Sequence, residues 1–216
     1  ICEGLVGSEM CIRDSVEAEG GCTDAHTLAV EVYPEVVANP VGALEGCAPW
    51  QSDLTAEGYA GASNHNITWT LPEGDTFEGV DLQRTFVGLE GQDEELTLGL
   101  SITSPFGCQA HSTVTATVHH TPVSDFTLSD MAACAGTEIA LLDASMYADE
   151  VTLDWGDGTG PAANSVGTHA FDNDNFEPMV VEVVQTATTA FGCEAHTSVN
   201  HTCLLYTSDA ADELRS

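Results

Sequence analysis

Three cysteines of the chain are each followed closely by a histidine, and these side chains are the ones best suited to chemistry. The cysteines are Cys22, Cys108 and Cys193, and the histidines are His26, His111 and His196. A thiolate and an imidazole can ligate zinc, whereas two thiols can form a disulfide. None of these histidines has a second histidine at ligand spacing, and no C-x-x-C pair occurs. We therefore expect structural disulfides and no zinc site.

The positions of the cysteines predict how they pair. Cys47 and Cys134 lie 87 residues apart, and each precedes one of the repeated Cys-His segments. This arrangement predicts one disulfide per module, Cys47–Cys108 and Cys134–Cys193, with Cys22 left without a partner. Such bonds persist at the cell surface, in the periplasm or outside the cell. Buried free thiols are the alternative.

An acidic loop at residues 172–177 offers oxygen atoms that calcium could bind. Its carboxylates belong to Asp172, Asp174 and Glu177. Calcium takes oxygen ligands in flexible geometries, but no glycine stands where an EF-hand loop requires one. The loop is therefore either a calcium site of another kind or a solvated turn. Beyond calcium, we expect no cofactor.

Catalysis would require a constellation that the sequence does not contain. A G-x-S-x-G elbow, an H-E-x-x-H pair and a phosphate-binding loop are all absent. Asp and Glu number 35, so pairs of carboxylates are too frequent to indicate a site. The sequence therefore predicts a protein that is not an enzyme.

The cysteines and histidines recur because the sequence contains an internal repeat with a period of about 86 residues. Residues 106–114 match residues 191–199 at a shift of 85, and residues 21–28 form a third copy. Such a period is longer than that of helical solenoids and is typical of small β-sandwich modules. Proline-containing joints near 32–34 and 120–122 mark the boundaries. The predicted parts are the last strand of one module (16–31), a full module (32–121) and a slightly truncated module (122–202).

Within each module the apolar residues alternate with a period of two. Residues 95–102 and 113–118 are the clearest examples, and turn residues separate such runs at 72–75 and 156–161. Alternation of this kind indicates strands with one buried face. The predicted fold is all-β, with tandem immunoglobulin-like antiparallel β-sandwiches.

The last module resembles the PKD domain. Residues 151–158 end in Trp-Gly-Asp-Gly, residues 167–171 hold a histidine two positions before an aromatic, and residues 179–184 form an alternating strand. The middle module has Trp69 but no Gly-Asp-Gly, and it is similar to PKD-like and Ig-like repeats of bacterial surface or secreted proteins. The resemblance implies a set of structural residues, namely Trp69, Trp155, Gly156, Asp157, Gly158, His169 and Phe171.

Physical chemistry gives these residues structural roles without reference to a family. A tryptophan in a strand at mid-module suits a sandwich core, because it buries a large apolar area. The two glycines of the Gly-Asp-Gly turn permit positive φ, and Asp157 can accept hydrogen bonds from nearby backbone N–H groups. We expect a structural Asp157 in preference to a catalytic one.

Both ends of the chain resemble translated sequencing adapters. Residues 5–15 and 203–213 back-translate to inverted copies of a transposon end used in library preparation. We therefore expect residues 1–15 and 203–216 to be non-native segments that bracket an internal fragment of a longer protein. A genuine leader or tail is the alternative.

The composition limits the partners. A formal net charge of −32, with only 3 Lys plus Arg, excludes nucleic-acid binding, and no apolar run is long enough to insert into a membrane. The PKD-like resemblance implies a non-catalytic extracellular spacer, stalk or adhesion module, on the cell surface or secreted, whose partners are neighbouring repeats of the same chain. The alternative is an accessory module of a secreted hydrolase that binds polysaccharide or protein.

Overall fold

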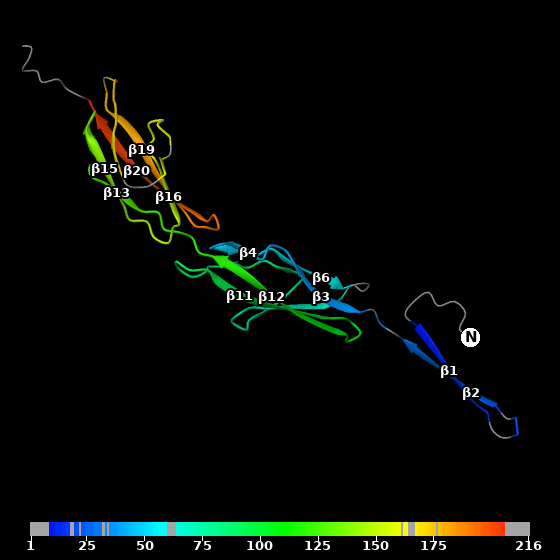
Figure 1. Ribbon diagram of the computed structural model, residues 1–216. Coiled ribbons are helices and arrows are strands. Elements are labelled where there is room, and N and C mark those ends of the chain that lie inside the picture. Colours follow the sequence, from blue (N-terminus) through cyan, green and yellow to red (C-terminus); the bar gives the residue numbers. More distant parts are fainter. Residues whose placement is uncertain are drawn as a thin grey trace, which may run out of the picture. The chain divides into compact units, whose positions relative to one another are not determined.

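The computed structural model describes residues 9–17, 20–21, 23–31, 33, 35–59, 64–160, 162–163, 167–175 and 177–205. Throughout these residues the protein is all-β, as the sequence predicts (Figure 1). The chain splits into two compact units. The first unit comprises residues 1–44, 52–84 and 96–116, and the second comprises residues 45–51, 85–95 and 117–216.

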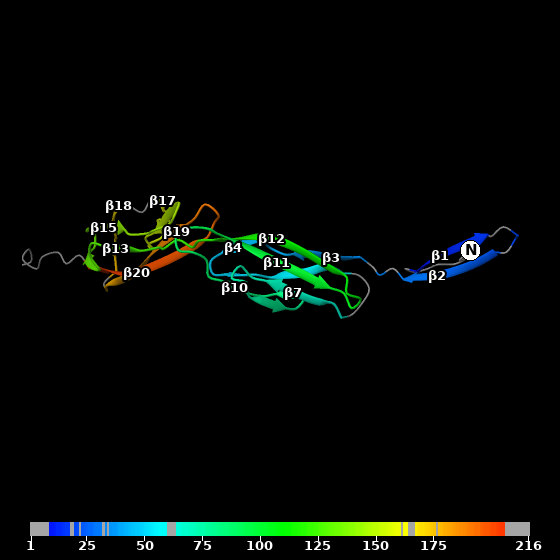
Figure 2. The same cartoon turned by 90° about the horizontal axis from the view of Figure 1, so that it is seen from below.

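The strands between residues 36 and 119 form two larger sheets and one short pair (Figure 2). The five-stranded sheet has the order β4 (Glu45–Cys47), β12 (Gln109–His119), β11 (Glu94–Thr103), β7 (Asn66–Thr70) and β8 (Thr76–Glu78). The three-stranded sheet has the order β3 (Val36–Val41), β6 (Leu54–Tyr59) and β9 (Asp81–Leu82). The short pair is β10 (Thr85–Phe86) with β5 (Trp50–Gln51). We call this part the middle module.

The strands between residues 126 and 204 form two sheets of similar design, which we call the last module. The five-stranded sheet has the order β14 (Ala132–Cys134), β20 (Glu194–Leu204), β19 (Met179–Thr188), β16 (Glu150–Asp154) and β17 (Ala162–Ala163). The three-stranded sheet has the order β13 (Phe126–Leu128), β15 (Glu138–Asp143) and β18 (Gly167–Ala170).

The longest strands of the two modules correspond residue by residue. β11 and β19 have the same length and the same burial pattern at a shift of 85 residues. The burial patterns of β12 and β20 differ only at the final residue of each strand. The alternation predicted for residues 95–102 is confirmed, because Leu96, Leu98, Leu100 and Ile102 are all buried. Period-two patterning therefore sets which face of each strand turns inward.

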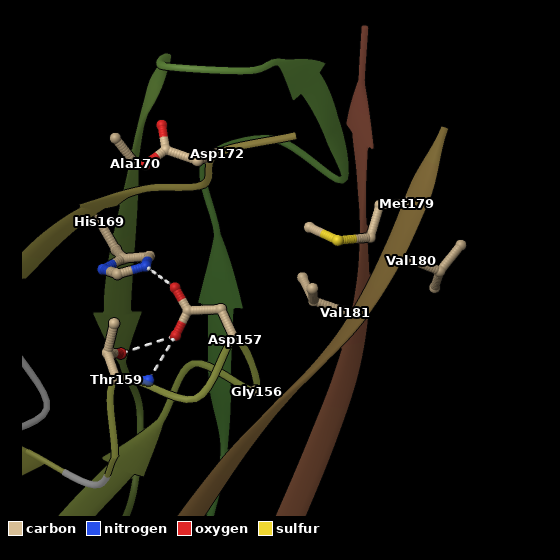
Figure 3. Close-up of a pocket in the computed structure, with 9 residues that line it drawn as sticks. All are labelled: Gly156, Asp157, Thr159, His169, Ala170, Asp172, Met179, Val180 and Val181. Atoms are coloured by element: carbon tan, nitrogen blue, oxygen red, sulfur yellow. Dashed lines mark hydrogen bonds and ion pairs between the residues drawn. The ribbon is translucent and has the colours of Figure 1, made fainter. Parts of the chain in front are cut away.

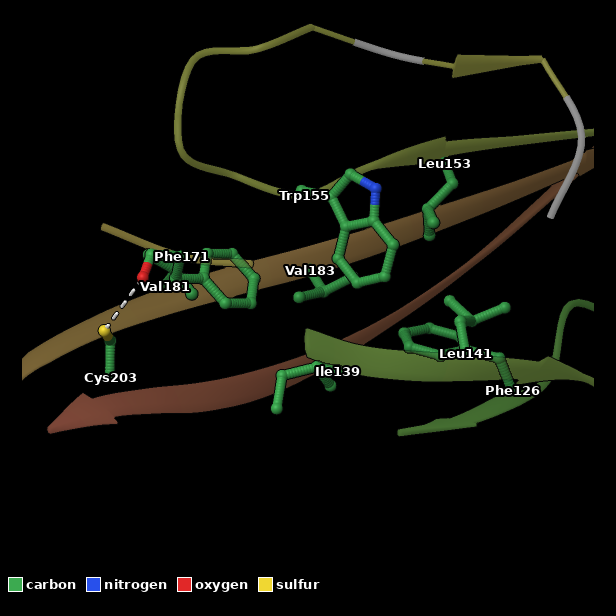
Figure 4. Close-up of a cluster of buried hydrophobic side chains, with 9 residues drawn as sticks. All are labelled: Phe126, Ile139, Leu141, Leu153, Trp155, Phe171, Val181, Val183 and Cys203. Carbon is green, nitrogen blue, oxygen red and sulfur yellow. Dashed lines mark hydrogen bonds between the residues drawn. The ribbon is translucent and has the colours of Figure 1, made fainter. Parts of the chain in front are cut away.

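The core of the last module is supplied by both of its sheets (Figure 4). Phe126, Ile139 and Leu141 come from the three-stranded sheet, and they face side chains of β16 and β19. In the middle module the largest fully buried side chain is Trp69 on β7. Trp155 is 7% exposed, so both tryptophans are core residues, as the sequence predicts.

Strands cross both of the predicted boundaries to adapter-like sequence. β1 (Glu9–Glu17) pairs antiparallel with β2 (Thr23–Glu31), and β20 continues to Leu204. Cys203, which the sequence assigns to the non-native end, is 1% exposed and belongs to the core of the last module. Its burial raises the pKa of the thiol, with further contributions from Asp172 and Cys134. The origin of the two end segments stays a prediction.

Candidate functional site

Asp157 of the Gly-Asp-Gly turn lies at the centre of a hydrogen-bond cluster (Figure 3). Its Oδ1 accepts from the backbone N–H of Thr159 at 3.0 Å and from the Thr159 hydroxyl at 2.7 Å, and its Oδ2 lies 2.6 Å from Nε2 of His169. Burial disfavours the ionised carboxyl, but the bonds from Thr159 and His169 outweigh it, so the pKa of Asp157 is lowered. The backbone bond is the one that the sequence predicts for Asp157.

The glycines that flank Asp157 adopt the backbone conformation that the turn requires. Gly156 has φ of +76° and Gly158 has φ of +87°. A Cβ atom at position 156 would lie 2.1 Å from the carbonyl oxygen of Glu182 on β19, so this strand crosses the turn too closely for any side chain. The turn therefore needs glycine for its conformation and, at Gly156, for the close approach of β19 as well.

Trp155 connects this cluster to the core. Its ring stacks on His169 at a centroid distance of 4.8 Å and meets Phe171 edge-on at 5.9 Å. The residues on which the PKD-like resemblance rests therefore lie together, although they come from the end of β16, the following turn and β18. The contact between Asp157 and His169 is the one that sequence reasoning missed, since twelve residues separate the two positions.

A hollow of about 510 Å³ lies beside Asp157, with Met179 and Val181 of β19 on its other wall (Figure 3). A threonine nucleophile activated by a histidine base would donate its hydroxyl hydrogen to that histidine. Here the Thr159 hydroxyl donates to Asp157 instead. The carboxylate thus binds the turn to β18 through His169, and this geometry supports a structural role.

The corresponding turn of the middle module is held by backbone bonds. The N–H of Leu71 donates to the carbonyl of Asp75 at 2.8 Å, and the N–H of Gly74 donates to the carbonyl of Leu71 at 2.9 Å. Trp69 precedes this turn and is completely buried, and its indole Nε1 has no hydrogen-bond partner among the described residues. This turn has no Gly-Asp-Gly motif, and the bonds described for it are made by backbone groups.

The cysteine pairing predicted from the sequence is wrong. Cys47 is bonded to Cys193, with a Cα–Cα distance of 5.6 Å, and both lie in the second compact unit. Cys108 and Cys134 are free. The bond therefore joins β4 of the middle module to the turn before β20 of the last module and closes neither module on itself. Cys22 lies outside the described residues.

Several contacts surround this bond. The ring of Phe191 stacks on His119 at 3.6 Å, and the N–H of Ala48 donates to the carbonyl of His119 at 2.8 Å. Asp93 accepts from His120 N–H at 3.0 Å and contacts Nδ1 of His120 at 2.7 Å and of His119 at 2.8 Å. These bonds, led by the backbone bond from His120, lower the pKa of Asp93 to about 2. No pattern in the sequence indicated a role for Asp93, because 26 and 27 residues separate it from the two histidines that it contacts.

The candidate calcium ligands do not form a cluster. Within the described residues, no group of three or more His, Cys, Asp or Glu side chains is placed to hold a metal ion. The loop at 172–177 is instead tied down by Asn173, whose side-chain amide donates to the carbonyls of Glu177 at 3.1 Å and Cys203 at 3.0 Å. Calcium binding by Asp172, Asp174 and Glu177 stays a prediction.

Comparison with known proteins shows weak structural likeness only. No protein-family model matches the chain, and no curated protein matches it. A structure of a 1.5-MDa bacterial ice-binding adhesin is 14% identical, with a TM-score of 0.36 over 93% of this chain and 75% of that chain. Fibronectin(III)-like modules of Clostridium thermocellum CbhA are 11% identical, with a TM-score of 0.39 over 80% of this chain and 98% of that chain. Likeness at these scores carries no argument about function.

Among the described residues, no helix is long and apolar enough to cross a membrane.

Proposed function

We propose that the chain is a non-catalytic, extracellular load-bearing segment that acts as a spacer, stalk or adhesion repeat of a larger surface or secreted protein. The observation that carries this proposal is the Cys47–Cys193 bond, which links β4 of one module to the turn before β20 of the next. A disulfide of this kind persists in oxidising compartments, which supports an extracellular location.

The bond restricts how far the chain can extend. Its two cysteines are 146 residues apart in the sequence, so tension applied to the ends bypasses every residue between them. At roughly 3.5 Å per extended residue, the bond withholds about 500 Å of contour length. A restriction of this sort suits a spacer that has to keep its length under tension.

The surface charge and the exposed rings support the same proposal. The net charge of −32 keeps the chain soluble and gives no cationic face for nucleic acid. Exposed Phe106 and Phe191 are each stacked on another ring of the chain, Tyr33 and His119 respectively. Because these two exposed rings are already stacked within the chain, they favour a spacer over an accessory module that would stack its rings on polysaccharide.

Stretching single molecules by their two ends tests the proposal. Unfolding in reducing buffer should release about 500 Å more contour length than unfolding in non-reducing buffer. Cys47→Ser should give the longer release in both buffers, and Cys108→Ser should behave like the unchanged chain. Equal contour lengths in the two buffers would contradict a load-bearing role for the bond.

A further inference from the structure

The turns that contain Cys108 and Cys193 have the same backbone structure. Before Cys193, the N–H of Thr189 donates to the Cys193 carbonyl, and the Cys193 N–H donates to the Thr189 hydroxyl. Before Cys108, Ser104 makes the same two bonds at 2.8 and 3.1 Å. The glycines that precede the cysteines have φ of +88° and +100°. The two thiols are therefore presented alike, although only Cys193 is bonded.

The phenylalanine two residues before each cysteine stacks on a ring at an equivalent position of the repeat. Phe191 stacks on His119, which ends the last strand of the module before its own. Phe106 stacks on Tyr33 at 4.0 Å with the planes 10° apart, and Tyr33 precedes His119 by 86 residues. The Phe106 turn therefore contacts Tyr33, which precedes the middle module, in the way that the Phe191 turn contacts His119, which precedes the last module.

Cys47 and Cys134 are equivalent as well. Cys47 ends β4, which runs parallel to the end of β12, and it is paired with His119. Cys134 ends β14, which runs parallel to the end of β20, and it is paired with Leu204. Cys134 is exposed and free, whereas Cys47 is bonded.

We propose that Cys134 and Cys108 are docking positions for further modules of the same kind, joined by the bond that Cys47 and Cys193 make here. Cys134 takes the Phe-Gly-Cys turn of a following module, and Cys108 takes the first-strand cysteine of a preceding one. This inference rests on the proposed function, because it extends the same bond along a series of repeats.

The bond forms by thiol–disulfide exchange with a small disulfide such as oxidised glutathione. One cysteine thiolate attacks the glutathione disulfide and releases one reduced glutathione, giving a mixed disulfide. The second cysteine thiolate then attacks the cysteine sulfur of the mixed disulfide and releases the second reduced glutathione. Two thiols are oxidised to one protein disulfide, glutathione disulfide is reduced, and the two thiol protons pass to the released glutathione thiolates.

Two extended chains test the proposal. In the first, residues 1–202 are followed by a second copy of residues 118–202, which continues the repeat in phase because Thr202 corresponds to Thr117. In the second, a copy of residues 33–118 is placed directly before residue 33. Each chain is oxidised in glutathione buffer, its remaining thiols are alkylated, and its disulfide peptides are mapped by mass spectrometry.

The first extension should link Cys134 to the Cys193 of the added copy, and the second should link Cys108 to the added Cys47. The alkylated fraction of each target cysteine should fall about tenfold or more relative to the unextended chain, since linkage raises the effective concentration of the partner thiol. Replacing the partner cysteine of the added copy by serine should restore alkylation. The original Cys47–Cys193 bond reports in every sample that the parent modules are folded.

A thiol retained at Cys134 in the first extension or at Cys108 in the second would overturn the proposal. A bond from either cysteine to a position other than the predicted one would also overturn it. Stretching of the unextended chain tests the proposed function without either extension. The two failures are therefore distinguishable.

Discussion

The Phe-Gly-Cys turns of the two modules have matching backbones, yet their sulfur atoms differ. Cys193 is bonded to Cys47, whereas Cys108 is free. Local sequence therefore determines the conformation of the turn, and the adjoining module determines whether its thiol finds a partner. A repeat whose cysteines bond outward can form a series, whereas a repeat whose cysteines bond inward is complete alone.

The turns that follow Trp155 and Trp69, unlike the Phe-Gly-Cys turns, differ in the bonds that hold them. In the last module the Asp157 side chain holds the turn through Thr159 and His169, whereas the bonds described for the turn of the middle module are backbone bonds. The two turns differ in sequence, although each follows a buried tryptophan at the end of a strand. The side-chain bonds of Asp157 are therefore a contribution that belongs to the last module.

The largest difference in the free energy of unfolding is expected between variants of two half-buried cysteines, Cys47 and Cys108. Cys47→Ser removes a bond that closes a loop of 146 residues, and the chain-entropy model gives up to about 5 kcal/mol for such a loop. Cys108→Ser removes no bond and should change the free energy of unfolding by less than about 0.5 kcal/mol. Urea denaturation without reductant measures both. Equal losses for the two variants would contradict the assigned bond.

The second comparison sets Asp157 against Asp75. Asp157→Ala removes three hydrogen bonds to a largely buried carboxylate, so we expect a loss of about 1–3 kcal/mol in the last module. Asp75→Ala leaves the backbone carbonyl that accepts from Leu71 N–H, and its effect should stay within about 0.5 kcal/mol. Thermal melts of both variants at neutral pH measure this difference.

The lowered pKa of Asp157 gives the same contact a pH dependence. A carboxyl whose pKa is lower in the folded than in the unfolded state stabilises the fold fully above its unfolded pKa, and this contribution is lost as the pH falls through the folded pKa. Acid titration of stability should therefore be flatter for Asp157→Ala than for the unchanged chain. Curves of equal steepness would argue against ionised Asp157 as the stabilising form.

A smaller effect is expected at Asp93. Its pKa of about 2, against an ordinary value of 3.8, means that its contribution is complete above about pH 4 and is lost as the pH falls toward 2. Because the carboxylate is 45% exposed, Asp93→Asn should lower the melting temperature only slightly at neutral pH, and the difference should vanish near pH 2. A difference that persists at pH 2 would assign the effect to packing instead.

The smallest expected difference concerns ions. Sodium chloride should raise the melting temperature of both modules, since a chain at −32 with 3 basic residues is destabilised by its own charge. Calcium at equal ionic strength should exceed sodium only if residues 172–177 bind it, and then only in the last module. A melting temperature that does not change with sodium chloride would contradict destabilisation by repulsion between the negative charges.

The elements that sequence predicted are those whose signals are local. Alternation placed the buried faces of β11 and β19, and the burial of Trp69 and Trp155 followed from their size and position. The positive φ of Gly156 and the backbone bond to Asp157 followed from turn chemistry.

The contacts that the sequence did not predict join residues of different elements. The repeat showed that Cys108 and Cys193 are equivalent, but equivalence does not say which module each thiol faces, and this is why the predicted pairing was wrong. The contact of His169 with Asp157 and the contacts of Asp93 likewise depend on how strands and loops pack. No periodicity encodes such packing.

Disulfide mapping of the unmodified chain tests the central claim most directly. The oxidised protein is alkylated, digested without reductant and analysed by mass spectrometry. The structure predicts one linked peptide pair that joins Cys47 to Cys193, with Cys108 and Cys134 recovered as alkylated thiols. Recovery of Cys47–Cys108 and Cys134–Cys193 would contradict a bond that links successive modules and would show that each module is closed on itself.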